Sequence, residues 1–197
     1  MTKSLIAIDC DEVLLPLHEP FLKHHNETYG TAYAYPDPEG RYYLHQFIGE
    51  HHDVVTQKLK TYSNSPEFAK LAPLAGAIKT INHLITRFRF VGITARQDFM
   101  QEVTFATLSQ NFGSAFEDIH FTPYNGKGEH SSKLQLCKEL GSRFIIDDNL
   151  HTVTECAAGG MEAILFGEYH WNKTNTLPAH VTRCQDWTAV KDYFDAR

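Results

Sequence analysis

An apolar run that stops at acidic residues constrains the fold of this chain more than any other feature of its sequence. Leu5 to Ile8 are all hydrophobic, and Asp9, Asp11 and Glu12 lie directly after them. A short run without polar alternation is typical of a parallel strand that is buried on both faces and ends at a site. Further runs of this kind are Phe88 to Ile93, Ile119 to Phe121, Phe144 to Ile146 and Ala163 to Phe166.

Amphipathic segments separate these apolar runs. The segments with helical periodicity are Ala77 to Thr86, Asp98 to Gln110, Ser132 to Leu140 and Leu150 to Ala158. Strands that alternate with helices of this length predict βαβ units and a mainly parallel sheet between two helical layers. The predicted fold class is therefore α/β, a three-layer Rossmann-like sheet, with a core formed by residues 1–14 and 74–197.

The stretch 15–73 does not fit this alternation. It is rich in His, Tyr and other polar residues, and two of its pieces, Phe21 to Tyr29 and Tyr43 to Thr61, have helix-like patterns. We expect 15–73 to form a helical cap that is inserted after the first strand and lies over the strand ends. We also expect it to line the pocket without supplying a metal ligand.

Composition and charge exclude several classes of protein. Hydrophobic residues make up 42% of the 197 residues and the formal net charge is −6, so a globular domain without a surface for duplex nucleic acid or an anionic membrane is expected. No apolar run has the length of a signal sequence or a membrane span, and the four cysteines show no CxxC spacing. We therefore expect a cytoplasmic protein with free thiols; the sequence predicts no oligomeric state.

Acids at two strand ends predict a metal site. Asp9 and Asp11 follow the first apolar run, and Asp147 and Asp148 follow the run that begins at Phe144. Crowded acids are costly unless a cation compensates them, and an oxygen-rich set of ligands suits Mg²⁺. At the first strand end, one carboxylate can attack a substrate while the other transfers a proton. Taken alone, each pair also fits solvated or helix-capping acids.

Candidate phosphate-binding groups lie at another strand end and at a helix start. Thr94-Ala95-Arg96 follows the second apolar run, where a hydroxyl, backbone amides and a guanidinium can hold phosphoryl oxygens. Thr94 also fits a helix N-cap. Lys133 lies near a helix start, where the helix dipole disfavours a cation, so a purely structural role explains it poorly. We therefore favour Lys133 over Lys127 and Lys138 as the functional lysine.

In this order, the residues resemble the four motifs of the haloacid dehalogenase (HAD) superfamily over most of the chain: Asp9-x-Asp11-x-Val13-Leu14, Thr94, Lys133 and Asp147-Asp148. The resemblance implies a HAD-like fold with a cap, phosphohydrolase activity and Mg²⁺ as the cofactor. It implies that Asp9 is the nucleophile that forms an aspartyl-phosphate and that Asp11 is the general acid and base. Thr94 and Lys133 would bind the phosphoryl group, and Asp9, the Asp11 carbonyl and Asp147 or Asp148 would hold the metal.

A finer resemblance lies in the inserted stretch. Phe21-Leu22-x-x-His25-Asn26-x-x-Tyr29-Gly30 is similar to the 5′(3′)-deoxyribonucleotidase-like group, which implies small phosphorylated substrates that include nucleoside monophosphates. Glu12 stands where that group commonly has Gly, and its charge would weaken phosphate binding unless it is paired, with Arg96 as the expected partner. The candidates for stacking on a base are Tyr33, Tyr35, Tyr42 and Tyr43. The choice between a nucleotide and a sugar phosphate stays open.

Functions of other classes fit parts of the pattern. A phospho-accepting receiver-like signalling domain also combines acids, a Thr and a Lys on a parallel sheet, but it needs no long insertion. A catalytically silent HAD-like binding protein is the other alternative, although both Asp9 and Asp11 are present. The pairs His24-His25 and His51-His52 lack zinc-site spacing and are expected on the cap surface or facing the substrate.

Overall fold

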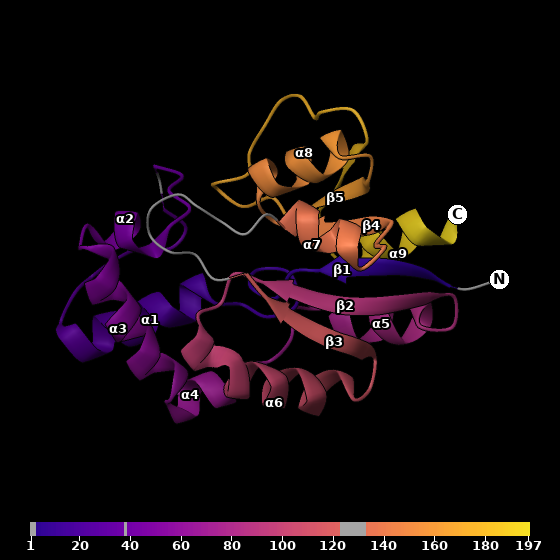
Figure 1. Ribbon diagram of the computed structural model, residues 1–197. Coiled ribbons are helices and arrows are strands. Elements are labelled where there is room, and N and C mark those ends of the chain that lie inside the picture. Colours follow the sequence, from indigo (N-terminus) through magenta and orange to yellow (C-terminus); the bar gives the residue numbers. More distant parts are fainter. Residues whose placement is uncertain (1–2, 38, 123–132) are drawn as a thin grey trace.

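The computed structural model describes residues 3–37, 39–122 and 133–197. Its centre is a six-stranded sheet in the order β3-β2-β1-β4-β5-β6, in which every pair of neighbouring strands is parallel (Figure 1). The strands are β1 (Ser4–Ile8), β2 (Phe88–Thr94), β3 (Phe116–Phe121), β4 (Phe144–Asp147), β5 (Glu162–Phe166) and β6 (Val181–Cys184). The predicted α/β class with a parallel sheet is confirmed.

Helices cover both faces of this sheet. The helices are α1 (His18–Tyr29), α2 (Leu44–Ile48), α3 (His52–Ser63), α4 (Pro66–Ala69), α5 (Ala77–Leu84), the 3₁₀ helix η1 (Asp98–Met100), α6 (Gln101–Phe112), α7 (Lys133–Glu139), α8 (Leu150–Ala158) and α9 (Trp187–Asp195). Ile6 and Ile8 of β1 belong to the hydrophobic core shared with α5, α6 and α9, whereas Leu5 and Ala7 belong to the core shared with α7 and α8 (Figure 1). Successive strand residues point to opposite faces of the sheet, so an uninterrupted apolar run contributes side chains to the hydrophobic core on each face.

The sequence patterns miss one edge strand of the sheet and find only part of the other. β6 and α9 have no predicted counterpart, and β3 begins at Phe116 rather than at Ile119. β3 and β6 are the edge strands, and their polar residues Glu117 and Thr182 are exposed, so neither strand is apolar over its whole length. Pairing with an inner strand places these segments in the sheet.

Helices α1 to α4 share a hydrophobic core of their own. The buried residues of this core include Phe21, Phe47, Val55 and Phe68, and Met100 of η1 joins them. The stretch 43–61 is predicted as one helix-like piece, but it is divided into α2 and α3. The division falls at Gly49, whose backbone is left-handed with φ of 75°.

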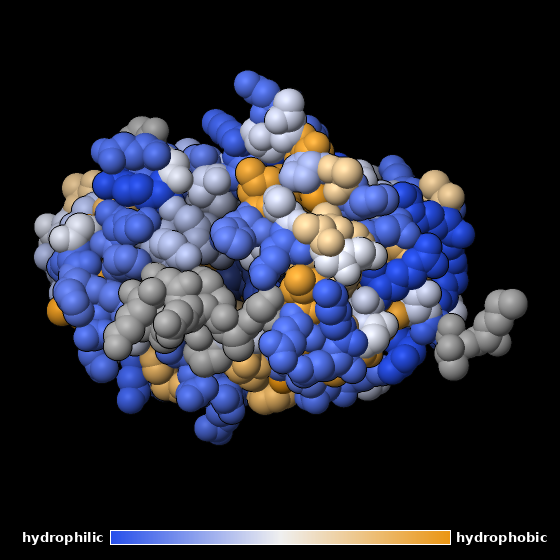
Figure 2. Space-filling model, turned by 45° about the horizontal axis from the view of Figure 1, so that its top comes forward, coloured by the Kyte–Doolittle hydropathy of each residue, from blue (hydrophilic) through white to orange (hydrophobic). Residues whose placement is uncertain are grey.

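The surface and the cysteines agree with a folded globular chain. Hydrophilic residues cover most of the face shown in Figure 2, and the hydrophobic residues on it form small groups. Within the described residues, no helix combines the length and the apolar character that crossing a membrane requires. All four cysteines are buried free thiols, as expected.

Candidate active site

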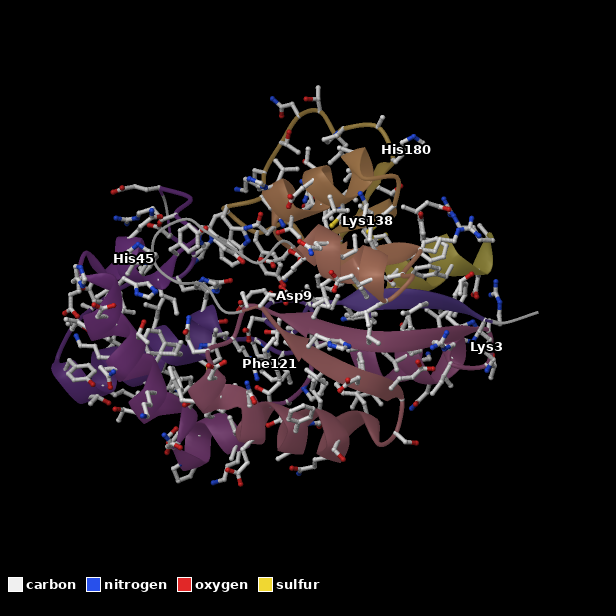
Figure 3. The ribbon with its side chains drawn as sticks, in the orientation of Figure 1. Lys3, Asp9, His45, Phe121, Lys138 and His180 are labelled. Carbon is white, nitrogen blue, oxygen red and sulfur yellow. The ribbon has the colours of Figure 1, made fainter. Side chains whose placement is uncertain are left out.

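The topology brings the candidate site residues to the carboxyl end of the sheet. β1 lies between β2 and β4, and the carboxyl ends of these parallel strands meet where the strand order reverses, which is the usual ligand site of such sheets. Figure 3 shows Asp9 at the end of the sheet nearer to helices α1 to α4, where His45 lies, and Lys3 at the opposite end.

Three buried carboxylates and one lysine form the centre of the site. Asp9, Asp147 and Asp148 each offer an oxygen, and these oxygens lie within 4.8 Å of one another. Lys133 Nζ, from the first residue of α7, lies 3.0 Å from Asp9 Oδ1 and 2.7 Å from Asp147 Oδ2. Asp147 Oδ1 accepts a hydrogen bond from the Asn149 amide. Lys133 therefore balances part of the negative charge of the cluster.

Charge remains uncompensated in this cluster. Burial, together with the charges of Asp147 and Asp11, raises the pKa of Asp9 to about 7 although Lys133 opposes the shift. Burial and the charges of Asp147 and Asp9 also raise the pKa of Asp148 well above its usual value. Asp148 Oδ1 is buried and has no hydrogen-bond partner among the described residues. A divalent cation fits this set of oxygens, because it supplies the missing positive charge and the missing partner.

Asp11 is paired with Arg96. Arg96 Nη2 donates to Asp11 Oδ1 at 2.7 Å, and Nε lies 3.1 Å from both carboxylate oxygens. Arg96 is buried, its Nη1 donates to Thr104 Oγ1, and its guanidinium lies 5.4 Å from the centre of the Phe68 ring in α4. A guanidinium in this position orients the Asp11 carboxylate through charge-assisted hydrogen bonds.

Glu12 is paired, but with His18. Glu12 Oε1 accepts hydrogen bonds from the backbone amides of Leu17 and His18, and Oε2 lies 2.8 Å from His18 Nδ1. These contacts outweigh the effect of burial, so the pKa of Glu12 is lowered and that of His18 is raised. The prediction that Glu12 pairs with Arg96 is wrong. Arg96 binds Asp11 instead, and the Glu12 carboxylate accepts hydrogen bonds from the amides at the start of α1.

The phosphate-binding candidates lie beside these groups. Thr94, the last residue of β2, is fully buried, and its Oγ1 accepts a hydrogen bond from the Arg96 amide. Ala95 is half-buried between them. Lys138 is exposed on α7 and points away from Asp9 (Figure 3), so Lys133 is the lysine that reaches the site. The rival Lys127 lies outside the described residues.

A cavity of about 330 Å³ adjoins the cluster. Its lining from the sheet side includes Asp11, Lys133 and Asp148. Asp9 and Thr94 do not line the cavity themselves. Asp9 contacts the lining residue Lys133, and Thr94 contacts the lining residue Arg96. The cavity has the size of a small ligand site, at the lower end of the usual range of roughly 300–1,000 Å³.

The inserted stretch contributes the other side of the cavity. Its lining residues are Leu17, His18, Tyr42, Tyr43, Leu44, His45, His52, Val55, Thr56 and Leu59. Tyr43 and His45 stack with ring centres 5.6 Å apart. Of the four candidate tyrosines, Tyr42 and Tyr43 line this cavity, whereas Tyr33 and Tyr35 pack against the core of α1 to α4. His25 is fully buried and contacts Thr31, so it is neither on the cap surface nor facing the cavity.

Two residues of the loop after β5 belong to the site and have no sequence signal that marks them. Trp171 Nε1 donates to Asp148 Oδ2 at 2.7 Å, and Asn172 Nδ2 donates to the Asp148 carbonyl at 2.9 Å. Neither residue lies at the end of an apolar run. Only the path of the loop after β5 brings them to Asp148, the residue that follows β4.

A parallel sheet in this order, with acids at adjoining strand ends and a lysine between them, defines a HAD-like hydrolase. Solved structures share the fold at low sequence identity. A haloacid dehalogenase-like hydrolase from Streptococcus pneumoniae has a TM-score of 0.67 at 13% identity, over 98% of both chains. One from Xanthomonas campestris has a TM-score of 0.66 at 15% identity, over 98% of this chain and 95% of that one. The HAD hydrolase YfnB from Bacillus subtilis, bound to magnesium, has a TM-score of 0.64 at 12% identity, over 99% and 100% of the chains.

The sequence places the chain more narrowly within this class. Residues 3–197 match the model of the family described as 5′ nucleotidase, deoxy (pyrimidine), cytosolic type C protein, so the chain belongs to that family. Together with the shared fold, this match makes the protein a HAD-superfamily hydrolase of the phosphatase class. A search of curated proteins found no match.

Proposed function

We propose that the protein is a Mg²⁺-dependent phosphomonoesterase that forms an aspartyl-phosphate on Asp9 and acts on nucleoside monophosphates. The observation that carries the proposal is the buried group of Asp9, Asp147 and Asp148, paired with Lys133 beside a ligand-sized cavity. The family match supports the nucleotidase reading.

The acidic cluster is the proposed cation site. Asp9, Asp147, Asp148 and the Asp11 carbonyl would hold Mg²⁺, which when bound supplies charge that offsets repulsion between the Asp9 carboxylate and the substrate phosphate. YfnB, which is reported bound to magnesium, has the same fold. The groups that would bind the phosphoryl oxygens are the Lys133 ammonium, the Thr94 hydroxyl and the amides of Ala95 and Arg96.

The chain's own carboxylates carry the reaction. An Asp9 oxygen attacks phosphorus in line, the bond from phosphorus to the leaving oxygen breaks, and Asp11 donates its proton to that oxygen. The Asp11 carboxylate then accepts a proton from water, whose oxygen attacks phosphorus and releases phosphate from Asp9. Arg96 holds the Asp11 carboxylate in one orientation through its hydrogen bond to Oδ1.

The stretch 15–73 is the proposed cap, and its side chains would determine substrate specificity. It supplies Tyr42, Tyr43, His45 and His52 to the cavity, and among the described residues it supplies no member of the acidic cluster. Aromatic rings stack on a base at a gain of about 1–3 kcal/mol, which corresponds to a preference of roughly tenfold to a hundredfold.

A phosphatase assay over nucleotides and sugar phosphates, with and without Mg²⁺, tests the proposal. We expect turnover that requires Mg²⁺ and a kcat/KM for a deoxynucleoside monophosphate at least about tenfold above that for a sugar phosphate. Equal specificity constants would show that the cap does not read a base. Turnover that is unchanged after removal of divalent cations would refute the magnesium site.

A further inference from the structure

The Asp148 carboxylate is held by the loop after β5, whereas Lys133 contacts the other two acids of the cluster, Asp9 and Asp147. The loop follows β5, and its Trp171 indole donates to Asp148 Oδ2 at 2.7 Å while Asn172 fixes the Asp148 carbonyl at 2.9 Å. Indole nitrogen is a donor only, so this contact requires an acceptor oxygen. The side chain and the backbone of Asp148 are thus each fixed by one residue of the same loop.

The indole is itself held in place. Tyr169 lies parallel to it with ring centres 4.8 Å apart and planes 9° from parallel, and the His18 ring lies 4.6 Å away. Tyr169 in turn donates its hydroxyl to the Glu12 carbonyl at 2.6 Å. The position of the indole N–H is therefore set by packing against groups that do not belong to the acidic cluster.

The rest of the loop is anchored to the sheet. Arg183 Nη1, from β6, donates to the Gly167 carbonyl at 2.6 Å and to Asn172 Oδ1 at 3.1 Å. Asn172 is fully buried and also donates to the carbonyl of Phe166 at the end of β5. A loop braced in this way can hold a side chain in one orientation, which is what a ligand to a cation requires from its neighbours.

One oxygen of Asp148 is left for a ligand. Oδ2 is taken by Trp171, whereas Oδ1 is buried and has no hydrogen-bond partner in the described part of the chain. Without the indole, rotation about the bond to the carboxylate would exchange the two oxygens. We propose that Trp171 is a positioning residue of the cation site, which pins Asp148 so that Oδ1 faces the bound ion. This inference rests on the magnesium site of the proposed function.

The test is cation binding to the metal-free protein. Trp171→Phe removes the donor and keeps an aromatic ring, and Mn²⁺ is titrated while the EPR signal of the free ion is followed, with Mg²⁺ as a competitor. Loss of such a supporting hydrogen bond typically weakens metal binding by about 10- to 100-fold, and we expect the Kd of both ions to rise by about tenfold or more. At saturating Mg²⁺, kcat should return to within about threefold of the wild-type value, because the nucleophile and the acid are intact.

The chain offers a matched control in its other tryptophan. Trp187 is fully buried and its Nε1 donates to the Val13 carbonyl at 2.8 Å, so Trp187→Phe also deletes a buried indole donor but leaves Asp148 untouched. We expect it to lower stability without changing the Kd for Mn²⁺. Equal weakening in both variants would attribute the effect to general loss of stability and overturn the inference.

A second variant separates shape from hydrogen bonding. Benzothienylalanine at position 171 replaces the indole N–H by sulfur and keeps the bicyclic ring, so it serves even where Trp171→Phe fails to fold. Wild-type affinity in this variant would overturn the role of Trp171 and leave the proposed function standing. Absence of cation binding in the wild-type protein would overturn the magnesium site and this inference together.

Discussion

At the scale of single residues, Glu12 combines a strained backbone with a compensating side chain. Its φ is 58°, in the left-handed region that costs roughly 1–2 kcal/mol for a residue with a side chain. The Glu12 carboxylate offsets this strain in two ways. It accepts hydrogen bonds from the backbone amides of Leu17 and His18 at the start of α1, and it pairs with the His18 ring. A carboxylate at a helix start is also favoured by the helix dipole.

Two substitutions separate these contributions. Glu12→Ala loses the contacts and keeps the strain, so we expect a loss of about 3 kcal/mol in the free energy of unfolding. Glu12→Gly loses the same contacts and relieves the strain, so it should be about 1 kcal/mol more stable than Glu12→Ala. Urea denaturation measures both values. Equal stability of the two variants would contradict the strain argument.

Asp9 carries a prediction about activity and pH together. Asp9→Asn should abolish turnover, because the amide cannot form the acyl phosphate. The pKa of Asp9 is raised from 3.8 to about 7, so the folded protein binds a proton that the unfolded chain releases, and this stabilisation is lost as the pH rises toward and through 7. Asn is neutral throughout. We therefore expect the metal-free variant to exceed wild type in Tm, with a gap that widens from pH 5 to pH 8.

Thermal unfolding in EDTA across this pH range checks the prediction. The full shift corresponds to a stability difference on the order of 1–4 kcal/mol. A gap that stays constant with pH would mean that Asp9 is ionised throughout. Wild-type turnover by the folded variant would remove Asp9 from the proposed mechanism.

At the scale of elements, Gly49 divides the helical pattern of the inserted stretch. It has φ of 75° and follows α2, and its amide donates to the His45 carbonyl. The turn lets α2 and α3 pack against each other, with Phe47 and Val55 in the same core. His45 of α2 and His52 of α3 thereby line the same cavity.

Substitution at this turn should cost stability according to backbone preference. A Cβ on Gly49 would meet nothing within 4 Å, so strain alone decides the outcome. We expect Gly49→Ala to lower the free energy of unfolding by about 1 kcal/mol, and Gly49→Asn to lower it less, because Asn tolerates the left-handed region. Equal losses in the two variants would point to another cause. Chemical denaturation provides the comparison.

At the scale of the whole molecule, cation binding should be coupled to folding and to pH. A ligand at about 100 times its Kd stabilises the folded state by about 2.7 kcal/mol, which raises Tm by roughly 5–10 °C for a chain of this size. The raised pKa values of Asp9 and Asp148 mean that protons compete with the ion at low pH. The rise in Tm on adding Mg²⁺ should therefore be larger at pH 8 than at pH 6.

Differential scanning fluorimetry of the EDTA-treated protein gives this measurement directly. Asp9→Asn removes one titrating ligand, so the pH dependence of its Mg²⁺ response should be weaker than that of wild type. An equal response at both pH values in the wild-type protein would show that the acids are already ionised without the metal.

The sequence by itself determined the inner part of the sheet and the principal residues of the candidate site. The runs at β1, β4 and β5 are continuously apolar, and the run at β2 is interrupted by the charged Arg89 alone, because both faces of these strands are largely buried; this signal is local. The acids and Thr94 follow such runs directly, so their meeting at one edge was a consequence of parallel topology. Lys133 was predicted because a cation at a helix start lacks a structural reason.

The tertiary structure decided what depends on contacts between distant segments. β6 is a strand because it pairs with β5. Arg96 binds Asp11 rather than Glu12 because β2 brings the guanidinium beside the Asp11 carboxylate. Trp171 reaches Asp148 only through the path of the loop after β5. A hydrogen bond between residues far apart in the chain depends on geometry within about 3 Å, and no local pattern of residue types records that geometry.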